Sequence, residues 1–315
     1  MQVVSEPTEF VSTASRVPSP EISVRPRAGR RFAGVLLPLP AGVLVACFLF
    51  GPIVAAFVIS LTNEALTGIH AITNHFVGFA NYASLFHDPL FGHSAYISLI
   101  YVVLAAIVGQ TGLGLLVAYM VHRGTSRWIT RFVGSTMIAA WVMPEIVAAM
   151  LWFAFAAQGG TLDKMLAPFG LGNVQWLTGA PLILVSIATV WGGAAFSMLI
   201  FSAGFRGLPD EVVEAAVVDG ARPWQRMLQV ELPMLRRTFA LNLILSTLST
   251  LTDFTMIYAL TGGGPGDATQ TLPQYAYQQT FSFSQLGYGD AAAVVLLLVS
   301  AVVVVLYVWI LKVEV

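Results

Sequence analysis

Six long apolar stretches constrain this chain more than any other feature of its sequence. They cover approximately residues 33–61, 95–121, 132–157, 181–204, 236–260 and 290–312. A helix of about 20 apolar residues crosses the hydrocarbon core of a bilayer. A membrane β-barrel needs short strands of alternating polarity, and the sequence does not contain that pattern. The sequence therefore predicts an all-α integral membrane protein with six transmembrane helices.

The composition excludes an ordinary water-soluble domain. Hydrophobic residues make up 57% of the chain and charged residues 10%, against about 25% charged residues in soluble proteins. The first 31 residues are polar and rich in proline and arginine, so we expect residues 1–31 to be a disordered tail and 32–315 to be one transmembrane domain. The single cysteine, Cys47, excludes a disulfide within the chain. The first apolar stretch is too long for a signal-peptide core, so it is expected to be a retained span.

The basic residues predict an orientation. With six spans, 14 of the 15 lysines and arginines fall on one side of the membrane, and Lys164 alone falls on the other. Loops rich in lysine and arginine stay in the cytoplasm. We therefore expect a multi-pass protein of the bacterial plasma (inner) membrane, with both termini cytoplasmic.

One polar segment interrupts the apolar second half of the chain. Leu208–Pro233 carries seven charged residues. Pro209 followed by two acids favours a helix start, Gly220 suits a turn, and Pro223 favours a second helix, which Pro233 is expected to end. The pattern predicts two short amphipathic helices in a cytoplasmic loop. Their apolar faces fit a partner protein or, alternatively, the bilayer surface.

Eight residues of this segment resemble the EAA loop of ABC-importer permeases. They are Glu214, Ala215, Ala216, Asp219, Gly220, Ala221, Leu232 and Pro233. The stretches Asp253–Pro265, Thr269–Ala293 and Gly78–Tyr82 resemble the carbohydrate-uptake branch of that family, in particular the larger permease of maltose transporters. The resemblance covers about residues 33–312. It implies the type I ABC importer (MetI-like) permease fold, in which residues 205–235 form the coupling loop.

The resemblance also implies the partners. These are a second homologous permease, a cytoplasmic ABC ATPase dimer, an extracytoplasmic sugar-binding protein and the lipid bilayer, with no nucleic acid. ATP and Mg²⁺ would be bound by the ATPase, so no cofactor is expected in this chain. The chain itself is not expected to be an enzyme or to bind a metal, because it shows no catalytic constellation and its histidines lack metal-ligand spacing.

Two acids inside the apolar stretches point to the transport path, since ionisable residues within a membrane are costly and mark functional sites. The resemblance places sugar contacts at Glu145, Thr189, Gly193, Phe196, Thr250 and Asp253. Phe196, together with nearby Trp191, suits stacking on a sugar ring. The family positions are mostly amide, hydroxyl or aromatic, whereas Glu145 and Asp253 are acidic. This departure suggests a cationic substrate, such as an amino sugar or a choline-bearing glycerol derivative. A neutral oligosaccharide is the alternative.

Three other classes are alternatives. An ion-coupled secondary transporter would use Glu145 and Asp253 as its proton or sodium site, but the inverted repeat of many such transporters is not visible. A glycerol-phosphodiester importer permease fits the same fold. A membrane enzyme lacks its catalytic residues. The glycine-rich run Gly262–Asp267 is not followed by Gly-Lys-Ser/Thr, so it does not predict a phosphate-binding loop.

Overall fold

The structure is a computed structural model that describes residues 39–124, 126–170, 172 and 174–311. Its internal contacts divide the chain into two units, residues 1–52 and 53–315. In the first unit, the described residues form α2 (Leu39–Val45), the π-helical η1 (Ala46–Phe50) and the start of α3 (Gly51–Ser60). The predicted tail, residues 1–31, lies outside the described residues.

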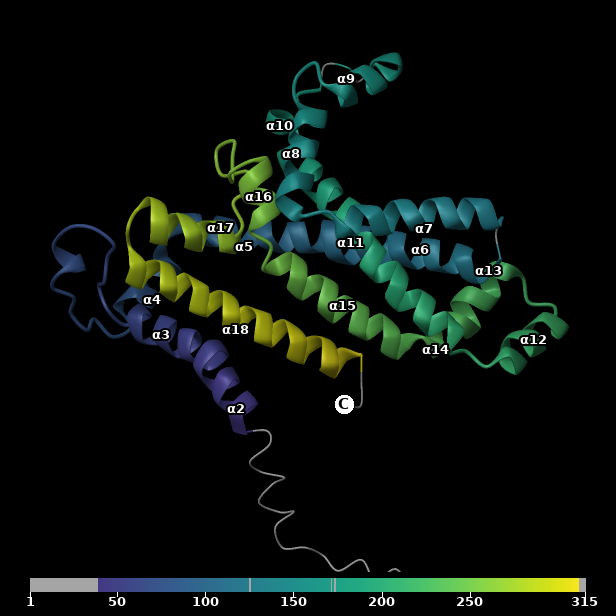
Figure 1. The fold of residues 1–315 in the computed structure, drawn as a ribbon, viewed down its shortest axis with the longest axis horizontal. Helices are drawn as coiled ribbons and strands as arrows, with labels where there is room; N and C mark the ends of the chain where they lie inside the picture. The colour runs from purple at the N-terminus through teal and green to yellow at the C-terminus, as the bar shows by residue number, and fades with distance from the viewer. Residues whose placement is uncertain (1–38, 125, 171, 173, 312–315) are drawn as a thin grey trace, which may run out of the picture. The chain divides into compact units, whose positions relative to one another are not determined.

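The second unit is helical throughout its described part, apart from loops and a single β-bridge between Thr62 and Phe76. After α3 its elements are η2 (Ile69–Ala71), α4 (Ala80–His87), α5 (Pro89–Val102), η3 (Val103–Gln110), α6 (Thr111–His122), α7 (Arg127–Val142), α8 (Glu145–Ala156), α9 (Thr161–Leu166), η4 (Ala167–Phe169), α10 (Trp176–Gly179), α11 (Pro181–Arg206), α12 (Asp210–Val218), α13 (Pro223–Gln225), η5 (Arg226–Glu231), α14 (Leu232–Met234), α15 (Arg236–Leu251), α16 (Thr255–Leu260), α17 (Leu272–Tyr277), η6 (Gln278–Ser282) and α18 (Leu286–Ile310). The prediction of an all-α protein is confirmed for these residues (Figure 1).

The number of continuous membrane-length helices is smaller than predicted. Among the described residues, four helices are long and apolar enough to cross a bilayer, namely Leu39–Ser60, Pro89–His122, Pro181–Arg206 and Leu286–Ile310. A fifth crossing results if the bent pair Trp128–Val142 and Glu145–Ala156 counts as one span. The predicted count of six transmembrane helices is therefore not confirmed among the described residues.

The two missing spans are both broken helices. The predicted span 132–157 bends by 110° between α7 and α8, because Pro144 forces the preceding residue out of the helical conformation; Met143 has ψ 134°. The predicted span 236–260 is divided into α15 and α16 at residues 252–254. This stretch is rich in Ser, Thr and Asn, whose side chains compete for backbone hydrogen bonds.

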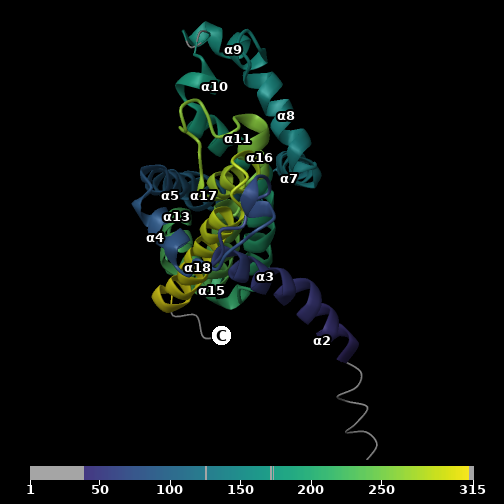
Figure 2. The same ribbon diagram turned by 90° about the vertical axis from the view of Figure 1, so that its left-hand side faces the viewer.

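Helix α11 lies at the centre of the second unit and packs against α6, η3, α7 and α15. Its contact with α6 depends on Gly114, where a Cβ atom would lie 2.8 Å from the Met198 backbone nitrogen. Small residues let membrane helices approach this closely. In both views α15 and α18 run side by side (Figure 1 and Figure 2). In Figure 1, α14 and α16 lie at opposite ends of α15.

Polar side chains of α15 point between the helices. Asn242 is fully buried and donates to the Thr111 hydroxyl at 2.9 Å, and Ser246 lies 3.5 Å from Ser197 of α11. Such hydrogen bonds hold helices together where no water is present. The polar character of this stretch is thus used for packing as well as for the cavity described below.

The close α6–α11 contact generates a stability prediction. We expect Gly114→Ala to lower the free energy of unfolding by about 1–3 kcal/mol, the usual effect of overpacking. At Gly112, in the same helix, a Cβ atom would meet nothing within 4 Å. Gly112→Ala should therefore be neutral or stabilising by up to about 1 kcal/mol, because alanine favours helix. Thermal unfolding of the purified chain in detergent measures both, and equal behaviour of the two variants would contradict the proposed packing.

Candidate functional site

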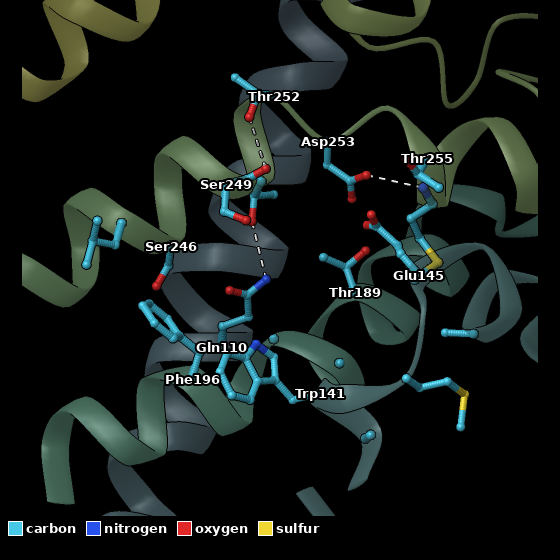
Figure 3. A pocket seen from close by; sticks show the side chains of 18 of the residues that line it. Gln110, Trp141, Glu145, Thr189, Phe196, Ser246, Ser249, Thr252, Asp253 and Thr255 are labelled. Carbon is cyan, nitrogen blue, oxygen red and sulfur yellow. Dashed lines mark hydrogen bonds between the residues drawn. The ribbon is translucent and has the colours of Figure 1, made fainter. Parts of the chain in front are cut away.

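A polar cavity of about 690 Å³ lies where the two broken helices meet α11 (Figure 3). Its walls come from the end of η3, the α7–α8 bend, α11, the second half of α15 and the start of α16. Hydroxyl, amide and carboxyl groups line these walls together with aromatic and aliphatic side chains. The polar side chains that line it are Gln110, Glu145, Thr189, Ser246, Ser249, Thr250, Thr252, Asp253 and Thr255.

Each helix break places one acid at the cavity. Glu145 is the first residue of α8, where a carboxylate is favoured by the helix dipole. Asp253 lies in the break before α16, and its Oδ1 accepts a hydrogen bond from the Met256 backbone nitrogen at 3.2 Å. This bond satisfies one of the free N–H groups that begin a helix. The same acids that mark the cavity therefore also stabilise the starts of two short helices.

Tyr101 of α5 connects two parts of the cavity wall. Its hydroxyl donates to Asp253 Oδ2 at 2.6 Å. The Thr189 hydroxyl lies 2.7 Å from the Tyr101 oxygen, and because the Tyr101 proton is used by Asp253, Thr189 is the donor of this second hydrogen bond. Tyr101 is buried, with 1% of its surface exposed. The sequence pattern did not reveal this residue, since an isolated tyrosine in an apolar stretch is a weak signal.

Gln110 lines the cavity, and the sequence pattern did not reveal it either. Its Nε2 donates to the Thr250 hydroxyl at 3.3 Å. A Cβ atom at Gly193 would lie 2.6 Å from the Gln110 side chain, so the glycine leaves the space that this amide occupies. A lone amide within an apolar stretch was the available signal, because buried polar groups in a membrane need a partner.

All six residues predicted to contact substrate line this one cavity. They come from α8, α11, α15 and the break before α16, which are far apart in the sequence. The fold therefore brings them together, while their role in binding stays a prediction.

Trp191 is not among the residues that line the cavity. It packs edge-on against Trp152, with ring centroids 6.2 Å apart, beside a buried cluster, so its stacking on a sugar stays a prediction. Trp141 of α7 lines the cavity instead, with its ring centroid 6.1 Å from that of Phe196. The 110° bend after α7 brings this tryptophan to the wall, and the sequence does not encode that bend angle.

Glu145 and Asp253 face one another across part of the cavity (Figure 3). Two carboxylates at close range in a poorly solvated site repel one another strongly. A shared proton or a cationic group would remove that repulsion. The arrangement can therefore accept hydroxyl groups from a polyhydroxy compound, or a positive charge, more readily than an anion.

The polar segment 208–233 forms the predicted pair of short helices. Helix α12 ends at Val218, Gly220 has a positive φ of 78°, and α13 begins at Pro223. The expected end at Pro233 is wrong: η5 and α14 continue the second helix through Pro233 to Met234. Proline is compatible with the first turn of a helical segment, and here it is the second residue of α14.

A cluster of hydrogen bonds anchors the second helix of this segment to the end of α6. The Pro223 carbonyl accepts from the Tyr119 hydroxyl at 2.9 Å and from Arg123 at 3.1 Å. Arg123 also lies 3.5 Å from Glu231, whose side chain is fully buried. A buried charge needs such a partner, so α6 and the segment 223–231 are tied together.

The outward side of the segment is partly apolar. Val218 is 87% exposed, Trp224 55% and Leu228 52%. Of the eight EAA-loop residues, Glu214, Ala215, Asp219, Gly220 and Pro233 are exposed, whereas Ala216 is buried and Ala221 and Leu232 are intermediate. Among the described residues, no group of three or more His, Cys, Asp or Glu side chains is arranged to hold a metal ion.

A helical bundle with membrane-length helices, an interior polar cavity and a pair of amphipathic helices at one end is typical of a transport permease. Residues 110–313 match the family described as binding-protein-dependent transport system inner membrane component. The chain belongs to this family.

Individual relatives agree with that assignment. The chain is 30% identical over 289 residues to the sulfoquinovosyl glycerol transport system permease protein of Agrobacterium fabrum, covering 90% of this chain and 92% of that protein. It is 30% identical over 266 residues to the trehalose/maltose transport system permease protein of Thermococcus litoralis, covering 83% and 87%. The fold is similar to a chain of a bacterial ABC transporter involved in import of the acidic polysaccharide alginate, with a TM-score of 0.77, 21% identity, and coverage of 90% and 96%.

The buried Arg123–Glu231 pair generates a second stability prediction. Arg123→Met leaves the Glu231 charge buried without its cation, and we expect a loss of about 3 kcal/mol, the lower end for such pairs. The double variant Arg123→Met/Glu231→Leu removes both charges and should recover most of this loss. Arg206→Met, at an exposed arginine, is the control and should stay within about 0.5 kcal/mol. Thermal unfolding in detergent measures all three, and an equal loss in the single and double variants would contradict the role of the pair.

Proposed function

We propose that this chain is a permease subunit of an ATP-driven importer that moves a sugar or sugar derivative across the inner membrane. The observation that carries the proposal is the polar cavity in which all six predicted contact residues meet, in a chain of the binding-protein-dependent transport family. Hydroxyl, amide and aromatic side chains around one cavity suit a polyhydroxy substrate.

The proposed topology has six crossings, with α7–α8 and α15–α16 each counted as one broken crossing. Both termini and the segment 208–233 then lie in the cytoplasm, in agreement with the distribution of lysine and arginine. Broken helices at a membrane-embedded site are tolerated where they line a cavity, which supports this count.

Energy for transport is proposed to come from a cytoplasmic ABC ATPase dimer, which binds the ATP and Mg²⁺. The exposed apolar side chains of α12 and of the second helix offer a surface for this partner, and exposed Glu214 offers it a charge. A second homologous permease would complete the transport path, and an extracytoplasmic binding protein would deliver the substrate.

A movement of the segment 208–233 on the ATPase would be transmitted to the cavity by one helix. The Arg123 contacts join the segment to the end of Pro89–His122, and the same helix carries Tyr101 and Gln110. An ion-coupled secondary transporter using Glu145 and Asp253 is the competing function, and it would need no ATPase.

The experiment that tests the function is expression of this chain together with its neighbouring genes, followed by reconstitution of the complex that copurifies. We expect a second permease and an ATPase to copurify, and ATP-dependent uptake by proteoliposomes of at least one of radiolabelled trehalose, maltose, sulfoquinovosyl glycerol and sn-glycerol 3-phosphate. The last compound tests import of a glycerol phosphate that has no sugar ring. Uptake driven by a proton or sodium gradient without ATP would overturn the proposal.

Gly220 provides the matched variants for the docking surface. Its φ of 78° is incompatible with proline, so Gly220→Pro should abolish ATPase copurification. Gly220→Asn should retain most of it, because asparagine tolerates this conformation. A Cβ atom at this position meets nothing within 4 Å, so the two variants differ in backbone preference and not in packing. Full copurification with Gly220→Pro would contradict docking through this turn.

The facing carboxyl groups favour a cationic substrate over an anionic one. If Glu145 recognises a positive charge, glucosamine should compete with the imported compound better than glucose does in wild type. Glu145→Gln should lower this preference about tenfold, which corresponds to the loss of one favourable charge interaction. Thr255→Val, elsewhere on the cavity wall, is the control. An unchanged preference in Glu145→Gln would favour a neutral substrate and a purely structural role for this acid.

A further inference from the structure

Four aromatic rings pack against one another beside the cavity. They are Phe254, Tyr258, Tyr277 and Phe281, and we refer to them as the aromatic track. The rings of Phe254, Tyr258 and Tyr277 contact one another, with centroids 5.0 Å apart for Phe254 and Tyr258, 4.6 Å for Phe254 and Tyr277, and 5.3 Å for Tyr258 and Tyr277. Phe281 extends the group outward, with its centroid 5.0 Å from that of Tyr277. The rings come from α16 and its start, from α17 and from η6, so the group exists only in the folded chain.

The track begins at the surface and ends in the cavity. Phe281 is 60% exposed and Tyr258 48%, whereas Phe254 follows Asp253 in the sequence and lines the cavity wall. Tyr275 of α17, in contrast, is 0% exposed. The outer members of the track are therefore accessible in this chain, unlike the neighbouring tyrosine.

The chemistry of the track suits a sugar ring more than a lipid chain. A flat aromatic face packs against the C–H face of a pyranose, and the tyrosine hydroxyls add hydrogen-bonding groups beside it. The Tyr258 and Tyr277 hydroxyls interact with each other, which raises the pKa of Tyr277 above its usual value. The segments that carry Tyr277 and Phe281 belong to the loop 261–289, on the side of the expected topology that is opposite to the ATPase.

We propose that the aromatic track guides sugar rings by successive stacking from the outer rim of the bundle into the cavity. The centroid spacings let a sugar contact the next ring before it leaves the previous one. The inference rests on the proposed function, and it adds an entry site that lies outside the six predicted contact residues. The ligand class is a compound with at least one pyranose ring.

The test uses the reconstituted complex and the same four radiolabelled compounds. Tyr258→Ala and Phe281→Ala should each lower the initial uptake of trehalose, maltose or sulfoquinovosyl glycerol by about threefold to tenfold at subsaturating loaded binding protein, as expected for loss of one stacking contact. Tyr258→Phe keeps the ring and should stay within about twofold of wild type. Phe283→Ala is the matched control, because Phe283 is 55% exposed and lies two residues beyond the track.

Each other outcome counts against the inference. Uptake by Tyr258→Ala and Phe281→Ala equal to that of Phe283→Ala would show that no sugar uses the track. Loss of the copurifying second permease in these variants would make the surface a subunit interface instead. If wild type imports sn-glycerol 3-phosphate and none of the other three compounds, the inference about the aromatic track is contradicted, because this compound has no ring. The proposal of an ATP-driven importer would still stand. Absence of any ATP-dependent uptake would overturn the proposed function itself.

Discussion

A polar group inside an apolar bundle must find its partner within the protein, and the cavity depends on how this constraint is met. The break before α16 frees backbone N–H groups, and Asp253 accepts one of them from Met256 while its other oxygen accepts from Tyr101. Tyr101 in turn lies against Thr189 of α11. A single carboxyl group thus holds the break open and joins it to two other helices.

Close helix packing shapes the same region. Gly114 lets α6 approach α11, and Gly193 leaves room for the Gln110 amide that bonds Thr250. The helix that carries Tyr101 and Gln110 runs from Pro89 to His122, a length of about 50 Å at the rise of an α-helix. Its end contacts the segment 223–231 through Arg123. The cavity and the proposed ATPase-docking surface are therefore parts of one connected framework, and a change at one end has a direct physical path to the other.

Local features of the fold were well predicted because local sequence chemistry determines them. Gly220 with Pro223 marked the turn between two amphipathic helices, whereas the break at Pro144 within the predicted span 132–157 was not predicted. The positions of Glu145 and Asp253 followed from the cost of acids in apolar stretches. The helix continuation past Pro233 was missed, because proline is also compatible with an early helical position, and the local pattern does not separate the two cases.

By itself the sequence determined that this chain is helical and membrane-embedded, and at which positions polar residues interrupt its apolar stretches. These properties depend on the length of each apolar stretch and on residue type, which are local. Only the tertiary structure decided which of those points meet. Tyr101 and Asp253 are 152 residues apart, and Trp141 replaces Trp191 at the cavity because of a bend whose angle no local pattern specifies. The aromatic track likewise joins residues of α16, α17 and η6. Such contacts arise from packing between distant helices, so the geometry of the site follows from the fold as a whole.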